Sequence, residues 1–171
     1  MRLSLVVAIL IVTFAAACSR PPAPALVEYR DEQHGFALRH PAPWRRDPAA
    51  AAGEVRFVPP GEVRSPGEFI SVFTVPADGP PTEAVLRRVV FGLLPIHGVS
   101  GFQQDPRTTP RALWHKFEVA GTTSGVEWAS VGVAVGTAER TQVAICAKPL
   151  AAWREGQKVC DEIIRSFRPS G

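Results

Sequence analysis

Alternating apolar and polar side chains predict short β-strands in two groups along the chain. The first group covers residues 27–30, 36–39, 55–58 and 68–75, and the second covers 112–120, 126–135 and 141–147. Turn-forming residues separate neighbouring segments, as they do between strands that fold back on one another. We therefore expect antiparallel pairing of 55–58 with 68–75 and a three-stranded meander in the second group.

Two segments follow the period of a helix instead. In residues 82–94 apolar side chains recur at helical spacing, with Thr82 placed to cap the first turn and Pro95 placed to end the helix. The second helix is expected to start with Pro149 in its first turn and to run to about Phe167. Because its apolar side chains form one stripe, this helix should lie against the sheet; the stripe contains Trp153, Cys160, Ile164 and Phe167.

The order of these elements is four strands, a helix, three strands and a helix, all joined by short connections. Such an order predicts an α+β fold in which helices pack on a mostly antiparallel sheet. The chain has 171 residues, an ordinary length for one domain. No composition break follows the first predicted strand, so we assign residues 27–171 to a single globular domain.

The first residues predict an export signal. Met1 and Arg2 form a short positive region, and residues 3–14 form an apolar run. As a helix this run of about 12 residues rises only ~18 Å, which is too short to cross a hydrocarbon core of ~30 Å. Residues 1–17 therefore indicate a signal peptide.

The sequence AAACS at residues 15–19 resembles the lipobox of bacterial lipoproteins. The resemblance implies a lipidated Cys18 and a Pro-rich tether over residues 18–26. Ser19, where an Asp would retain the protein in the inner membrane, implies an outer-membrane location facing the periplasm in a Gram-negative host. Two alternatives stay open. One is plain secretion, since Ala15 stands where the lipobox prefers Leu and the alanines also suit ordinary cleavage, and the other is an uncleaved anchor.

If Cys18 is lipidated, Cys146 and Cys160 remain as an even pair in an oxidising compartment. We expect these two to approach each other, either as a disulfide or as two small buried side chains. A disulfide would stabilise the fold by about 3 kcal/mol in the chain-entropy model. The rise of the helix argues against contact, because it carries Cys160 some 16 Å from Pro149 while Cys146 lies close to that junction.

Composition and motifs limit which functions the sequence supports. Lys+Arg 19 against Asp+Glu 16 gives a net charge of +3, and the absence of long cationic runs argues against nucleic-acid binding. Residues 98–101 fall short of a G-x-S-x-G elbow, and the sequence contains no H-E-x-x-H, C-x-x-C, Walker A or G-x-G-x-x-G motif. We therefore predict no catalytic residues, no metal site and no cofactor.

Histidines and tryptophans are the remaining candidates for chemistry or contact. His34 and His40 could approach each other across a turn, but no third ligand is matched to them. His115 is in phase with the apolar positions of its strand, and we expect a satisfied, semi-buried histidine rather than a catalyst. An exposed Trp114 or Trp128 would mark a contact surface; we expect both faces of the sheet to be covered instead.

Both ends of the domain carry motifs that resemble the PsbP and Mog superfamily. Residues 35–44 (GFALRHPAPW) resemble its opening motif, and residues 163–168 (IIRSFR) resemble its closing motif. The resemblance implies an α/β/α sandwich over an antiparallel sheet, with Trp44 and Phe167 as packing residues. The superfamily includes an extrinsic photosystem II subunit, a nuclear-transport cofactor and many bacterial lipoproteins, so the resemblance does not fix a function. None of its functional residues maps onto this chain by motif.

These observations favour a non-enzymatic module of the bacterial cell envelope, tethered to the membrane through Cys18 and binding a protein partner. A small-ligand or metal-binding periplasmic lipoprotein is a second class, and a hydrolase with an unrecognised site is a third. A broad apolar surface would favour the first class. A cleft that gathers His40 or His115 with carboxylates would favour the hydrolase.

Replacing Cys18 with alanine tests the predicted anchor. We expect Cys18→Ala to move the protein from the membrane fraction to the soluble periplasm, or to leave it unprocessed, because the acyl chains supply the membrane affinity. Mass spectrometry of the mature N-terminus checks the same point directly. An unmodified Cys18 in the mature protein would contradict the prediction.

Overall fold

The computed structural model describes residues 24–61, 67–77, 79–93 and 96–170. The strands are β1 (Leu26–Asp31), β2 (Phe36–Pro41), β3 (Arg45–Arg46), β4 (Glu54–Val58), β5 (Phe69–Pro76), β6 (Ile96–Gln104), β7 (Leu113–Thr123), β8 (Val126–Gly136), β9 (Arg140–Pro149) and β10 (Arg168–Pro169). The helices are α1 (Glu83–Leu93) and α2 (Leu150–Ser166). All predicted strands are present, and Cys18 lies outside the described residues.

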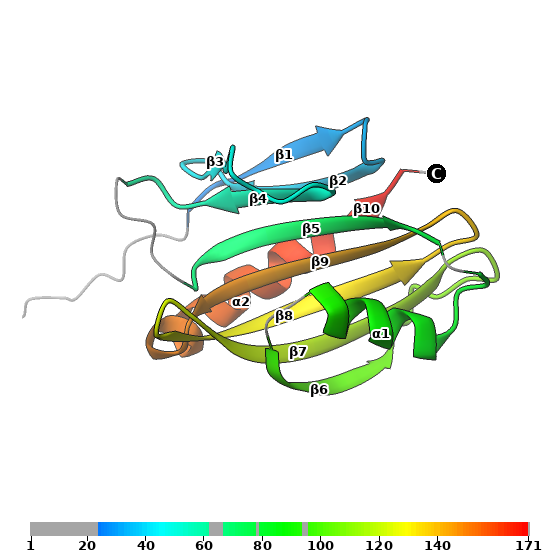
Figure 1. The fold of residues 1–171 in the computed structure, drawn as a ribbon. Helices are drawn as coiled ribbons and strands as arrows, with labels where there is room; N and C mark the ends of the chain where they lie inside the picture. The colour runs from blue at the N-terminus through cyan, green and yellow to red at the C-terminus, as the bar shows by residue number, and fades with distance from the viewer. Residues whose placement is uncertain (1–23, 62–66, 78, 94–95, 171) are drawn as a thin grey trace, which may run out of the picture.

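The strands form two antiparallel sheets (Figure 1). Seven strands make the larger sheet in the order β3-β4-β5-β9-β8-β7-β6, and three make the smaller one in the order β1-β2-β10. The predicted pairing of β4 with β5 and the predicted meander β7-β8-β9 are both confirmed.

Helices cover both faces of the larger sheet, so the predicted α+β sandwich is confirmed. Figure 1 shows α1 in front of this sheet and α2 behind it, with β1 and β2 alongside. Strand alternation separates two cores: Phe117, Ile145 and their neighbours pack with α1, whereas Val131, Cys146 and their neighbours pack with α2 and β2. Neither helix among the described residues combines the length and the apolar character needed to cross a membrane.

Helix α2 contacts both sheets, packing on β8 and β9 of the larger one and on β2 of the smaller one. Its buried side chains are Cys160, Ile163 and Ile164, and Phe167 follows at its C-terminal cap. The ring of Phe167 lies 6.0 Å from that of Phe36 and 6.2 Å from that of Trp114, measured between centroids. Residue 167 therefore joins β2 of the smaller sheet to β7 of the larger one.

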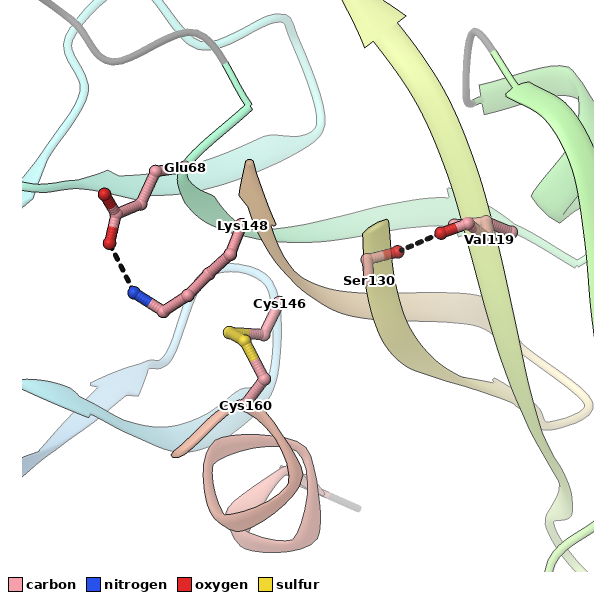
Figure 2. Close-up of a disulfide and its surroundings, with 6 residues drawn as sticks. All are labelled: Glu68, Val119, Ser130, Cys146, Lys148 and Cys160. Atoms are coloured by element: carbon pink, nitrogen blue, oxygen red, sulfur yellow. Dashed lines mark hydrogen bonds and ion pairs between the residues drawn. A yellow bond between two sulfur atoms is a disulfide. The ribbon is translucent and has the colours of Figure 1, made fainter. Parts of the chain in front are cut away.

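A disulfide joins Cys146 of β9 to Cys160 of α2, with the Cα atoms 5.2 Å apart (Figure 2). The expectation that the rise of the helix works against contact is wrong. From the β9–α2 junction, the strand and the helix both run in the same direction. The distance between Cys146 and Cys160 along that direction is therefore the difference between the two lengths, not their sum. The ten residues from Leu150 to Cys160 rise about 15 Å, and the three from Cys146 to Pro149 span about 10 Å.

A glycine lets a lysine side chain cross the start of α2. A Cβ on Gly156 would lie 2.1 Å from Cδ of Lys148, so a larger residue would have to displace the lysine side chain. Lys148 reaches past this point and forms an ion pair with Glu68 (Figure 2). Its ammonium group also lies 5.5 Å from the centre of the Trp44 ring. Trp44 of the N-terminal motif thus packs beside the β9–α2 junction.

Three strands were not predicted. Strands β3 and β10 have only two residues each, too few to show alternation. Strand β6 contains Gly98 and Gly101, and its pairing with β7 shifts register twice, so an alternating pattern is interrupted. The predicted end of the first helix, at residues 94–95, lies outside the described residues.

Phe167→Ala tests how α2 packs against the two sheets. Phe167 is 1% exposed and contacts aromatic rings from both sheets. We expect this substitution to lower the free energy of unfolding by roughly 3–5 kcal/mol through lost burial and a residual cavity. Urea denaturation measures it, with Leu150→Ala as the control because Leu150 is 51% exposed. Equal stability of the two variants would contradict this placement of α2.

Candidate functional site

Helix α2 packs over β8, β9 and β2, and part of the larger sheet beside it is open to solvent. On the α2 side of β7, Trp114 is buried, but Lys116, Glu118 and Ala120 are exposed. Because side chains alternate along a strand, these four residues form one continuous row on that face. The row changes from covered to open as it runs along β7.

Two adjoining hollows follow this row, with volumes of about 260 and 300 Å³. Both are lined by Glu118, so we treat them as one feature and call it the α2 groove. Several of its lining residues are small: Ser100, Gly101, Ala120, Ala129, Ser130 and Gly132. Small side chains leave the backbone of the sheet close to the surface there.

A charged pair stacked on a tryptophan forms one end of the α2 groove. The carboxylate of Asp105 accepts hydrogen bonds from Nε and Nη2 of Arg107 at 2.9 and 3.1 Å, and from the Arg107 backbone N–H at 2.9 Å. The guanidinium of Arg107 lies 4.2 Å from the centre of the Trp114 ring. Hydrogen bonding from Arg107 lowers the pKa of Asp105 below its ordinary value, so the carboxylate is ionised at neutral pH.

The other end of the α2 groove is less polar. Trp153 of α2, half-buried, lies there with Ala120 and Ala129. Ser130 is buried and donates its hydroxyl proton to the carbonyl oxygen of Val119 at 3.4 Å (Figure 2). Trp153 was expected in the buried stripe of the helix; its partial exposure makes it part of this surface instead.

The open edge of the larger sheet borders the α2 groove. Within the described part of the chain, strand β6 is the last strand of that sheet and pairs only with β7. An edge strand presents backbone N–H and C=O groups that can pair with an added strand. The α2 groove has a tryptophan at one end and an ion pair at the other. Together with the β6 edge, it has a shape suited to an extended segment of another chain.

His34 and His40 lie toward opposite ends of β2, so the approach that the sequence left open does not occur. His34 lies at the β1–β2 turn, where its Nδ1 is 3.0 Å from Oδ1 of Asp31. His40 lies near the other end of β2, where it is buried, stacks on Phe57 with centroids 4.3 Å apart and places Nδ1 2.9 Å from the carbonyl oxygen of Pro41. Among the described residues, no three His, Cys, Asp or Glu side chains lie close enough together to hold a metal ion.

His115 was expected to be satisfied and semi-buried, and the structure corrects both points. The residue is 3% exposed, and its Nδ1 has no hydrogen-bond partner among the residues that the structure describes. The Nε2 atom lies 3.6 Å from Oε2 of Glu83, and the ring stacks on Phe102 at 5.0 Å between centroids. His115 lies on the α1 side of the sheet, opposite the α2 groove, because it contacts Glu83 of α1 and alternates along β7 with Trp114 and Lys116.

The expected burial of both tryptophans is confirmed, because Trp114 is 7% exposed and Trp128 is 1% exposed. The expectation that both faces of the sheet are covered fails on the α2 side of β7, where Lys116, Glu118 and Ala120 are exposed.

Sequence reasoning did not single out Asp105. In the structure its carboxylate lies at a turn and binds the Arg107 side chain. The Asp-Pro-Arg spacing is compatible with such a pair, whereas the stacking on Trp114 depends on how β6 and β7 pair.

This architecture is the PsbP/Mog-like fold, as comparison with solved structures shows. No family model matches the chain, and no curated protein matches it in sequence. The solution structure of cyanobacterial PsbP (CyanoP) from Synechocystis sp. PCC 6803 is similar, with a TM-score of 0.58 at 16% identity, covering 91% of this chain and 98% of that chain.

Two further structures agree. The Ran-binding protein Mog1p of Saccharomyces cerevisiae has a TM-score of 0.54 at 11% identity and covers 86% of this chain and 96% of its own. A protein from Bacteroides thetaiotaomicron VPI-5482 has a TM-score of 0.54 at 12% identity and covers 84% of this chain, which spans only 48% of that protein. At such identities the likeness establishes the fold.

Removing the Arg107 guanidinium tests the charged end of the groove. Because the pKa of Asp105 is lowered in the folded protein, Arg107 stabilises the fold above the unfolded carboxyl pKa of about 3.9. We expect Arg107→Gln to raise the pKa of Asp105 in an NMR titration. It should also cost about 1 kcal/mol of stability at pH 7, a loss that shrinks as the pH falls below about 4. A pKa of Asp105 unchanged by the substitution would contradict the assignment.

Proposed function

We propose that this protein is a non-enzymatic binding or accessory module of the bacterial cell envelope, tethered to the membrane by a lipid on Cys18. In this proposal its α2 groove binds an extended segment of a protein partner. The single observation that carries the proposal is the groove itself, which runs beside the open β6 edge.

The chemistry of the α2 groove suits binding. Its floor of small residues lets a partner backbone approach the sheet. Lys116 and Glu118 are exposed and would favour a bound segment with complementary charges. At one end the ion pair with Asp105 already holds Arg107 in place, so little side-chain conformational freedom is lost when a partner binds there.

The start of the chain supports the tethered part of the proposal. The apolar run, the AAACS sequence and the Pro-rich segment before β1 have the order of signal, lipidation site and spacer. In Figure 1, β1 and β6 lie on opposite sides of the molecule, so a tether joined to β1 would leave the β6 edge open to a partner. The Cys146–Cys160 disulfide suits an oxidising compartment.

The titratable groups support a binding role rather than catalysis. Asp105 is held ionised by Arg107, which makes it a poor general acid. His40 and His115 are buried and are not residues that line the α2 groove. Protein binding also has a precedent on this fold in the yeast Ran-binding protein, although a shared fold is only an analogy.

Site-specific photo-crosslinking in intact cells tests the proposal. A photoreactive amino acid at position 120 or 129 of the full chain would lie in the α2 groove, and the same group at position 32, exposed in the β1–β2 turn, is the matched control. We expect one protein adduct of the same mass from both groove positions and none from position 32. Lys116→Glu should reduce this adduct severalfold, because it reverses a charge within the groove.

Each other result would overturn the proposal. Equal adducts from position 32 would show that crosslinking reflects proximity in the envelope rather than the groove. Adducts of small mass alone would favour the small-ligand class. An adduct that Lys116→Glu leaves unchanged would show that the partner lies elsewhere.

A further inference from the structure

A second groove lies on the outward face of the smaller sheet and holds four arginines. It has a volume of about 430 Å³, and its wall is the last turn of α2. We call it the Arg groove; its arginines are Arg30 of β1, Arg39 of β2, Arg165 of α2 and Arg168 of β10. Four elements that are distant in sequence thus bring cations to one place.

The strand pairing explains why a hollow forms there. Phe36 and Leu38 of β2 are buried, so the alternate positions, Ala37 and Arg39, face outward. Ala37 is paired with Arg30 on one side and with Arg168 on the other. A methyl group therefore forms the floor between two long cationic side chains.

The wall of the Arg groove is fixed to its floor by a hydrogen bond. The backbone N–H of Arg39 donates to Oγ of Ser166 at 2.8 Å, and the Ser166 hydroxyl donates to the carbonyl oxygen of Ile163 at 2.6 Å. These bonds hold the C-terminal turn of α2 against β2. The arginines consequently project from a backbone that is already in position.

The positive charges of the Arg groove exceed the negative ones. Arg30 is neutralised by Glu28, with Nε 2.7 Å from Oε1. Within the described part of the chain, the guanidinium groups of Arg39, Arg165 and Arg168 have no ion pair, and Glu162 is the carboxylate that remains among the lining residues. Three cations against one anion leave an excess of two positive charges.

We propose that the Arg groove binds a phosphate group. A carboxylate presents two oxygens in one plane and is satisfied by a single guanidinium fork, whereas a phosphate presents oxygens in several directions. Arginines that project from a strand, a helix end and a second strand can reach phosphate oxygens that point in several directions. The pattern of charge therefore favours a phosphate over a carboxylate.

Two sources can supply such a group: the headgroup of an anionic lipid or a soluble phosphate compound. The proposal does not require a protein partner in the α2 groove, because Arg30, Arg39 and Arg168 lie outside that groove. Arg165 lines both grooves and is therefore left unchanged in the variants that test either one.

NMR of the arginine side chains in the full chain tests both sources. In neutral detergent micelles, inorganic phosphate should shift the Nε–Hε signals of Arg39, Arg165 and Arg168 along one saturable curve, while acetate at equal ionic strength should not. In nanodiscs, phosphatidylglycerol should shift the same signals relative to phosphatidylcholine if a lipid headgroup is the source. A response to inorganic phosphate alone assigns a soluble phosphate ligand.

Three variants separate a defined site from diffuse attraction. Arg39→Gln with Arg168→Gln should weaken the affinity at least tenfold, whereas Arg45→Gln with Arg154→Gln removes the same charge from exposed positions outside the groove and should not. Ala37→Leu fills the floor while every charge stays, and it should also weaken the affinity at least tenfold. Thermal unfolding confirms that each variant is folded.

The proposal fails under any of three results. The first is no saturable shift with phosphate or with phosphatidylglycerol. The second is equal loss of affinity in the Arg45 and Arg154 control. The third is unchanged affinity in a folded Ala37→Leu variant, which would show that net charge alone attracts the anion.

Discussion

The position of α2 on the larger sheet determines where the other features of this structure lie. The helix is held by the Cys146–Cys160 bond near its middle and by Phe167 at its end, where the ring packs between Phe36 and Trp114. Because α2 lies over β8 and β9, the outer part of β7 stays open and becomes the floor of the α2 groove. The last turn of the same helix becomes the wall of the Arg groove. Both surfaces are consequences of where one helix lies.

Most of the fold follows from local pattern. Strands such as β5, β8 and β9 are long and apolar, and α1 has a Thr82 cap whose Oγ1 accepts a hydrogen bond from the Val85 N–H at 3.3 Å. What escaped prediction depends on distant residues. Strand β10 exists only because Phe167 carries the chain back to β2, and β6 is irregular enough that its pairing with β7 defines it. Neither has a periodic signal of its own.

The candidate sites were harder to foresee than the fold, for a related reason. Arg30, Arg39, Arg165 and Arg168 form no cationic run, and the two terminal motifs that contain Arg39, Arg165 and Arg168 indicate packing residues rather than a shared site. Only strand register places Arg30 and Arg168 on either side of Ala37. The same holds for Trp114 and Arg107, which meet because a turn after β6 returns the chain to β7. Binding surfaces built from exposed residues carry no apolar period, so sequence pattern does not reveal them.

The arrangement also constrains how the two grooves relate to each other. Helix α2 is one rigid element of 17 residues, covalently joined to β9, and both grooves lie along it with Arg165 common to the two. A hinge between them would require α2 to leave the sheet, which would break the Cys146–Cys160 bond and expose Cys160, Ile163 and Phe167. The separation and relative direction of the grooves are therefore fixed by the core. A ligand in one groove has a defined position relative to a ligand in the other without any change of conformation.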